Sequence, residues 1–84
     1  MKRRLLIDLE VLQTLAAIPL RTRRRLWKRI EELQEFPDRY AEYQEKTPDG
    51  RDADVNVHAG FAISYWDDFA DRHVKVLHIG PADR

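Results

Sequence analysis

The sequence predicts an α+β domain in which an N-terminal helical hairpin packs on a small, twisted antiparallel β-sheet of three to five strands. Two observations carry this prediction. Apolar residues between positions 9 and 33 recur at helical spacing, as expected for two amphipathic helices. Residues 60–66 and 73–80 are instead short runs of β-branched and aromatic residues bounded by turn signals, which is typical of strands. Residues 67–72 separate these two runs, so they can pair as a hairpin.

The length and composition indicate a single domain over residues 1–84. A chain this short hides roughly 60–65 % of its unfolded surface, which leaves one modest core. It has no cysteine, so disulfides and thiolate metal sites are excluded. No apolar run approaches the roughly 20 residues of a membrane span, and Asp8 and Glu10 interrupt the basic start, unlike in a signal peptide. We expect a cytoplasmic protein with no membrane partner.

The net charge of zero hides two halves of opposite sign. Residues 1–30 contain nine basic and two acidic residues, a net charge of +7, and residues 31–84 contain six basic and thirteen acidic residues, a net charge of −7. A basic half of this kind can meet nucleic acid or an acidic protein.

The N-terminal elements are a short strand over residues 3–7 and a helix that Asp8 caps. The spacing predicts that one helical face packs on the sheet, with Val11 and Ile18 widening a stripe of Leu9, Leu12, Leu15 and Ala16. Pro19 ends this helix, because proline lacks an amide hydrogen and disfavours helical geometry in the preceding residue.

A second helix is predicted from residue 20 or 22 to residue 35, with Leu26, Ile30 and Leu33 as its buried stripe. The connection between the helices is short, so they should be antiparallel neighbours. Arg23, Arg24 and Arg25 occupy the first turns, where the helix dipole is positive and each cation costs about 0.3–1 kcal/mol. Two interpretations stay open: a solvated face, or a basic patch that binds a phosphate backbone or an acidic protein.

The second half of the chain is predicted to consist of short strands joined by turns. Residues 40–46 form a strand or an extended connection, and residues 47–50 (Thr-Pro-Asp-Gly) form a turn. Residues 51–58 alternate, with Val55 and Val57 on one face and Asp54, Asn56 and His58 on the other. After a tight turn at Ala59-Gly60, the next strand places Phe61, Ile63 and Tyr65 against the helices, and Ala62, Ser64 and Trp66 on the opposite, open face.

The order of these elements resembles the RelE/ParE superfamily of toxins from bacterial type II toxin–antitoxin modules. Residues 60–65 (Gly-Phe-Ala-Ile-Ser-Tyr) look like that family's Gly-Tyr-Arg-Val-x-Tyr strand, and residues 76–80 (Val-Leu-His-Ile-Gly) look like its last strand. The helical hairpin looks like its Leu-x-x-Leu-Pro helix pair, through Leu15, Pro19, Leu26, Ile30 and Leu33. The resemblance covers nearly the whole chain.

The resemblance implies a toxin or toxin-like protein that a cognate antitoxin neutralises, with plasmid stabilisation and translation inhibition as the associated roles. Ribosome-dependent members cut mRNA with basic residues on the open sheet face. Ala62 stands where that family has an arginine, Ala53 and Val55 (or Asp54 and Asn56) match its lysines, and only Arg84 follows the last strand. Because losing one such cationic donor typically costs about 10²–10³ in rate, we expect RNA cleavage by that route to be largely lost.

Candidate site residues are histidines and polar side chains of the predicted sheet. His58 and His78, with Asp54 and Asn56 nearby and Arg84 as the remaining cation, could carry out acid–base chemistry as a rearranged endonuclease. They could equally be polar residues of a solvated or antitoxin-covered face. Trp66 is either a partner contact or a core residue. The sequence contains no His-x-x-x-His spacing and no Gly-rich phosphate loop, so we expect neither a metal nor a cofactor.

Three functions therefore stay open. They are a ribosome-dependent mRNA endonuclease, a non-enzymatic poison of DNA gyrase that uses the basic helix, and a toxin-like protein that survives as a binding partner. The carboxylates of the C-terminal half disfavour RNA, because they repel phosphates.

Overall fold

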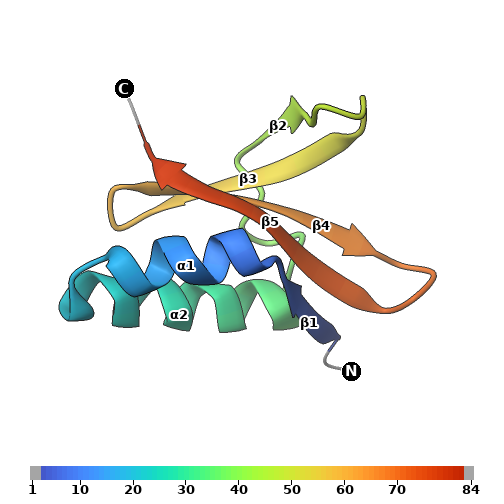
Figure 1. Cartoon of the computed structure of the whole chain (residues 1–84). Coiled ribbons are helices and arrows are strands. Elements are labelled where there is room, and N and C mark those ends of the chain that lie inside the picture. The colour runs from blue at the N-terminus through green and yellow to red at the C-terminus, as the bar shows by residue number, and fades with distance from the viewer. Residues whose placement is uncertain (1–2, 83–84) are drawn as a thin grey trace.

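The computed structural model describes residues 3–82, which form one curled sheet with two helices on one side (Figure 1). The elements are, in chain order, β1 (Arg4–Ile7), α1 (Leu9–Ala17), α2 (Leu20–Glu35), β2 (Tyr43–Lys46), β3 (Asp52–His58), β4 (Phe61–Asp68) and β5 (His73–Pro81). The predicted α+β class, the helical hairpin and the strand number are confirmed. The proposed single domain contains all of these elements.

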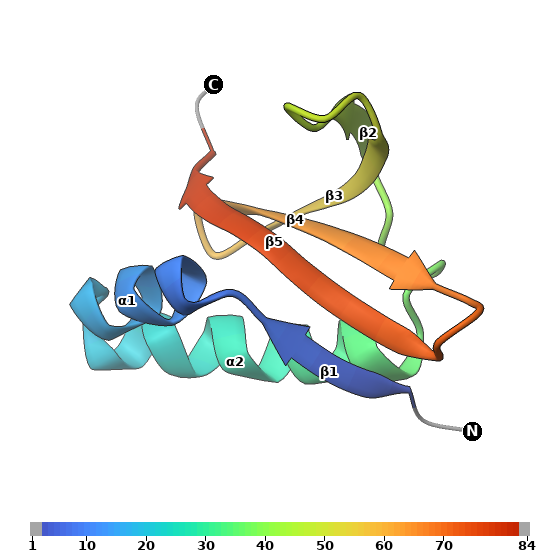
Figure 2. The ribbon, with the colours of Figure 1, turned by 45° about the vertical axis from the view of Figure 1, so that its right-hand side comes forward.

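The strand order is β1-β5-β4-β3-β2. The pairs β2–β3, β3–β4 and β4–β5 are antiparallel, as predicted. Strand β1 instead pairs parallel to β5, which makes the sheet mixed. The connectivity permits the parallel pair, because β1 and β5 are far apart in sequence and the helical hairpin carries the chain away after β1 (Figure 2). Strand β1 therefore forms one edge of the sheet and β2 the other.

The two helices run antiparallel beneath the sheet (Figure 1). Asp8 occupies the N-cap position of α1, as predicted, but its side chain makes no capping hydrogen bond. Helix α1 ends at Ala17, with Ile18 as its C-cap and Pro19 next. Pro19 is then the N-cap of α2, so the connection is as short as the sequence indicates.

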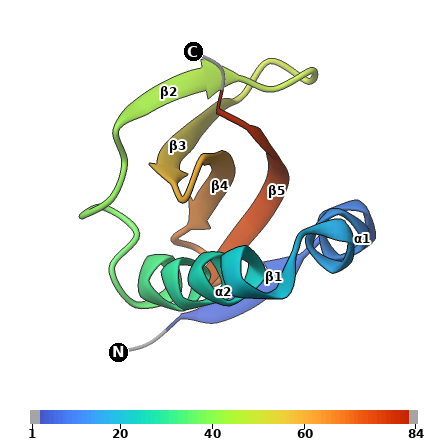
Figure 3. The same cartoon turned by 90° about the vertical axis from the view of Figure 1, so that its left-hand side faces the viewer.

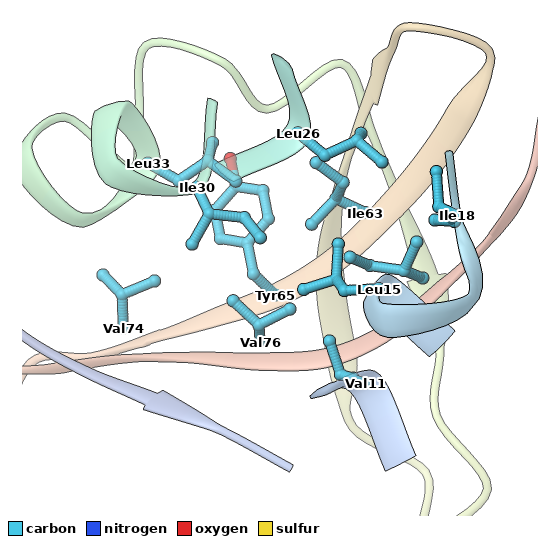
Figure 4. Close-up of a cluster of buried hydrophobic side chains, with 11 residues drawn as sticks. Val11, Leu15, Ile18, Leu26, Ile30, Leu33, Ile63, Tyr65, Val74 and Val76 are labelled. Atoms are coloured by element: carbon cyan, nitrogen blue, oxygen red, sulfur yellow. The ribbon is translucent and has the colours of Figure 1, made fainter. Parts of the chain in front are cut away.

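The core lies between the helices and the sheet (Figure 4). Its buried side chains come from both helices and from β4 and β5: Val11, Leu15, Ile18, Leu26, Ile30, Leu33, Ile63, Tyr65, Val74, Val76 and Ile79. Burying one such aliphatic side chain stabilises the fold by about 1.5–3 kcal/mol. This cluster supplies most of the stability available to so small a domain.

The predicted buried face of α1 is wrong, because the helix is rotated about its axis relative to the prediction. Leu9 and Leu12 are exposed, at 68 % and 41 %, and Ala16 is exposed too. The buried stripe is Val11, Leu15 and Ile18, whose spacing of four and three residues is also helical. Apolar residues occur around most of this helix, so periodicity could not choose between the two faces. An apolar stripe is left on the surface.

Two turns direct the strands that carry the candidate site. Ala59 and Gly60 have φ values of 53° and 83°, the left-handed pair that a tight two-residue hairpin requires between β3 and β4. The β2–β3 turn closes through the Thr47 amide, which donates to the Arg51 carbonyl at 2.7 Å. These turns set which residues of β2, β3 and β4 stand opposite one another.

Candidate functional site on the open face of the sheet

The strand register assigns every sheet residue to one of two faces, because residues paired across neighbouring strands point the same way. Ile63 and Tyr65 of β4 are in the core and pair with Asn56 and Asp54 of β3. We call this side the helix face. Ser64 pairs with Val55 and with His78, and these residues lie on the other side, the open face.

This assignment corrects part of the predicted site. Asp54, Asn56 and His58 share one face of their strand, as predicted, but that face is the helix face and not the face of Ser64. His58 pairs with Phe61, which packs against the core, whereas His78 pairs with Ser64. The structure therefore does not bring His58 and His78 together. Alternation is clear within one strand, but only the pairing register relates one strand to the next.

Asn56 is a buried polar residue on the helix face, only 2 % exposed, and both ends of its side chain are occupied. Its Oδ1 accepts a hydrogen bond from Arg29 of α2 at 3.0 Å. Its Nδ2 donates to the Tyr40 carbonyl at 3.1 Å and to Glu42 Oε2 at 3.0 Å. Arg29 also pairs with Glu32 at 2.9 Å and stacks 4.3 Å from the Tyr40 ring centre. Asn56 thus joins α2, β3 and the segment before β2.

His58 lies near the same cluster. Burial lowers the pKa of its imidazole, and the positive charges of Arg29 and Arg25 lower it further, with Glu32 opposing them. The neutral form is favoured. No hydrogen bond joins the imidazole to another described residue.

The open face contains a cleft of about 470 Å³. Figure 3 shows the sheet curling from β5 through β4 and β3 to β2, which makes this face concave. The cleft is lined by Asp8, Glu10, Glu45, Lys46, Thr47, Pro48, Asp49, Arg51, Asp52, Ser64, Trp66, Leu77 and His78. A second hollow continues towards Val57, Ala62, Gly80 and Pro81, and shares Glu45, Ser64 and His78 with the first. These three residues form the middle of one groove.

Ser64, Glu45 and His78 meet there by register. Ser64 is 4 % exposed, and its hydroxyl donates to Glu45 Oε2 at 2.9 Å. The His78 ring folds back over Gly80, since a Cβ added at Gly80 would lie 3.0 Å from His78 Nε2. Because residue 80 is glycine, no Cβ crowds the position that the imidazole occupies. A carboxylate and an imidazole on one exposed face can accept and donate protons or hold a polar partner.

Trp66 lines the cleft and is half-buried, so it belongs to the open face and not to the core. Arg51 stacks on it, with its guanidinium carbon 4.2 Å from the ring centre, and Lys75 Nζ lies 6.0 Å from that centre. Glu45, Arg51 and Lys75 were not among the predicted site residues. The turn at residues 47–50 could have pointed to Glu45, because it places β2 opposite β3.

The remaining predicted residues lie elsewhere. Arg24 and Arg25 are exposed on α2, while Arg23 donates through Nε to the Ile18 carbonyl at 3.2 Å and so helps to hold the turn between the helices. Arg84 falls outside the described residues. Arg24 and Arg25 are therefore exposed cations of α2, and neither of them lines the open-face cleft.

Carboxylates outnumber cations in the cleft. Five acidic side chains and two basic ones line it, a net charge of −3 with His78 neutral. Lys46 is paired with Asp52 at 2.9 Å and Arg51 with Asp49 at 3.5 Å. Within residues 3–82, Asp8, Glu10 and Glu45 have no cation paired with them. Across the same residues no group of three or more His, Cys, Asp or Glu side chains is placed to hold a metal ion, and neither helix is long and apolar enough to cross a bilayer.

Comparison with known proteins finds likeness in structure and not in sequence. No family model matches the chain, and no curated protein matches it. A solved archaeal RelE–RelB complex from Pyrococcus horikoshii is similar with a TM-score of 0.78 at 19 % identity, over 96 % of each chain. The toxin–antitoxin complex RelBE2 of Mycobacterium tuberculosis is similar with a TM-score of 0.82 at 12 % identity, over 98 % of this chain and all of that one. The isolated Escherichia coli RelE toxin is similar with a TM-score of 0.75 at 21 % identity, over 98 % of this chain and 86 % of that one. The chain has the fold of these RelE toxins.

Proposed function

We propose that this chain is the toxin, or a toxin-like protein, of a type II toxin–antitoxin pair and that a cognate antitoxin binds it. The observation that carries the proposal is the likeness of fold over nearly the whole length of chain and neighbour, with TM-scores of 0.75–0.82 for the three structures above. Two of those neighbours are toxin–antitoxin complexes. The concave, unpartnered sheet face supports a role in binding.

We further propose that the chain does not cleave RNA by the route of the ribosome-dependent members. Ala62, Ala53 and Val55 all lie on the open face, where that reaction would need cations to hold the scissile phosphate. The carboxylates of the cleft would also repel an RNA backbone. His78 and Glu45 leave a different acid–base site as the enzymatic alternative, without His58.

The second candidate is a poison of DNA gyrase or another target bound by the basic surface of α2. Arg24 and Arg25 are exposed there, and no acidic residue stands in the first turn of the helix. Such a surface favours an acidic partner or a phosphate backbone. We propose testing it with the double variant Arg24→Glu/Arg25→Glu, against the matched control Arg4→Glu/Arg39→Glu, whose arginines are also exposed.

Tightly repressed expression in Escherichia coli, with and without each small open reading frame found beside the gene, tests the main proposal. We expect the neighbouring product to co-purify with this chain as a stable complex and to relieve any growth arrest that the chain causes alone. Cleaved mRNA would identify an endonuclease, a DNA-damage response a gyrase poison, and normal growth a binding partner without toxicity. Failure of every neighbouring small protein to bind the chain would overturn the proposal.

A further inference from the structure

We infer that the open-face cleft, together with the exposed leucines beside it, docks a segment of a partner protein that carries both basic and apolar side chains. This inference rests on the proposed function and names the chemistry of the partner segment. Two independent features support it, a surplus of negative charge in the cleft and exposed leucines in the chain segment that supplies two of the cleft carboxylates.

The charge surplus calls for cations from outside the chain. After the pairs Lys46–Asp52 and Arg51–Asp49 are set aside, Asp8, Glu10 and Glu45 are left in the cleft. Adding Lys75, which lies near Trp66, still leaves the carboxylates in excess. Charge complementarity of this kind steers a partner of opposite sign and fixes its orientation. A lysine or arginine side chain could reach these carboxylates over the apolar surface of Trp66 and Leu77.

The apolar stripe comes from the same stretch of chain as two of the carboxylates. Leu6 of β1 pairs with Lys75, which pairs with Trp66, so Leu6 is on the open-face side of the edge strand. Leu9 and Leu12 follow on α1, three residues apart on one helical face. All three are 40 % exposed or more. These exposed leucines would add apolar contacts to a protein segment that binds the cleft.

The two features together favour a protein segment over RNA. An RNA backbone brings phosphates to carboxylates and gains little from leucines. A basic amphipathic helix could place an apolar side chain on Leu9 and its cations at Asp8 and Glu10, between which Leu9 lies in the chain. Helix-in-groove recognition of this kind reads side chains that recur every three or four residues.

Fluorescence anisotropy with two labelled probes tests the inference. One is a peptide of about 14 residues, long enough for about four helical turns, with leucine and arginine at helical spacing. The other is a single-stranded RNA of about ten nucleotides, within the span of known single-strand sites. We expect the peptide to bind more tightly than the RNA, and its affinity to fall as salt is raised.

Matched variants distinguish the effect of the cleft carboxylates on peptide binding from the effect of the protein's overall negative charge. The cleft variant is Asp8→Asn/Glu10→Gln/Glu45→Gln, in which asparagine still suits the cap position and glutamine can still accept from Ser64. Its control is Glu31→Gln/Glu35→Gln/Asp71→Asn, with the same change in charge at exposed positions outside the cleft. Exposed ion pairs are each worth about 1.4- to 5-fold in affinity, so we expect the cleft variant to weaken peptide binding about tenfold and the control to leave it within about twofold.

A second pair of variants tests the apolar stripe. The test variant is Leu9→Ser, and the control is Leu20→Ser, which changes an exposed leucine at the start of α2. Only the first should weaken the peptide. Undetectable peptide binding, tighter RNA binding, or equal losses in a variant and its control would each overturn the inference. None of these outcomes bears on the proposed function, which the co-purification experiment tests separately.

Discussion

Asn56 and Ser64 are both buried polar residues, at 2 % and 4 % exposure, yet they lie on opposite faces of the sheet in contrasting surroundings. On the helix face, Asn56 bonds to Arg29, Tyr40 and Glu42, and Arg29 also pairs with Glu32. On the open face, Ser64 bonds to Glu45, whose carboxylate has no cation paired with it among the described residues. Equal burial therefore does not imply an equal role. Asn56 belongs to an internal hydrogen-bond network. Ser64 instead bonds to Glu45, whose negative charge at the surface is available to a partner.

We expect the helix face to determine stability and the open face to determine binding. The largest effect on stability should therefore come from a core substitution. Ile30→Ala removes a fully buried side chain of α2, and we expect the free energy of unfolding to fall by about 2–5 kcal/mol. Leu12→Ala removes an exposed leucine of α1 and should cost less than about 1 kcal/mol. Urea unfolding followed by circular dichroism measures both. A comparable loss in the two variants would contradict the assignment of the core.

The comparison itself is tested by truncating the two polar residues. Asn56→Ala leaves Arg29 and Glu42 without a shared partner, and we expect a loss of about 1–3 kcal/mol in the free energy of unfolding. Ser64→Ala removes one hydrogen bond beside a carboxylate that water can reach, and should cost about 0.5–1.5 kcal/mol. A larger loss for Ser64→Ala in the same urea experiment would reverse the contrast.

His58 makes the helix face sensitive to pH. Burial and the charges of Arg29 and Arg25 hold the pKa of its imidazole below 6.5, so the unfolded chain takes up a proton more readily than the folded one. Its contribution to stability is complete above pH 6.5 and is lost as the pH falls through the folded-state pKa. We expect the urea midpoint to decrease less between pH 7 and pH 5 in His58→Gln than in the natural chain. An equal decrease in the midpoint of His58→Gln and of the natural chain would contradict this expectation.

The smallest expected effect on stability is that of Arg51, which sharpens the description of the open face. Arg51→Gln loses an exposed cation–π contact with Trp66 and an exposed ion pair, and we expect a change in stability of about 0.5–1 kcal/mol. Removal of the cation makes the cleft more negative, so the basic peptide should bind more tightly to this variant. Weaker binding in the anisotropy measurement would mean that Arg51 itself contacts the partner.

Much of the fold could be predicted from local patterns. Pro19, the turn at residues 47–50 and the Ala59-Gly60 pair act through their own backbone preferences, so the elements they separate were predictable. The alternation of β4 also placed Ile63 and Tyr65 in the core correctly, because they share one face with Phe61 as a set of bulky, largely apolar side chains. These features depend on residues close together in the chain.

The sequence by itself determined the α+β class, the order of the elements and the grouping of Asp54, Asn56 and His58 on one face of their strand. Only the tertiary structure decided which side of the sheet that face occupies, that β1 pairs parallel to β5, and that α1 buries Val11 and Leu15 while Leu9 and Leu12 stay outside. The reason is physical: periodicity states which side chains share a face, but strand register and helix rotation are set by contacts between residues distant in sequence.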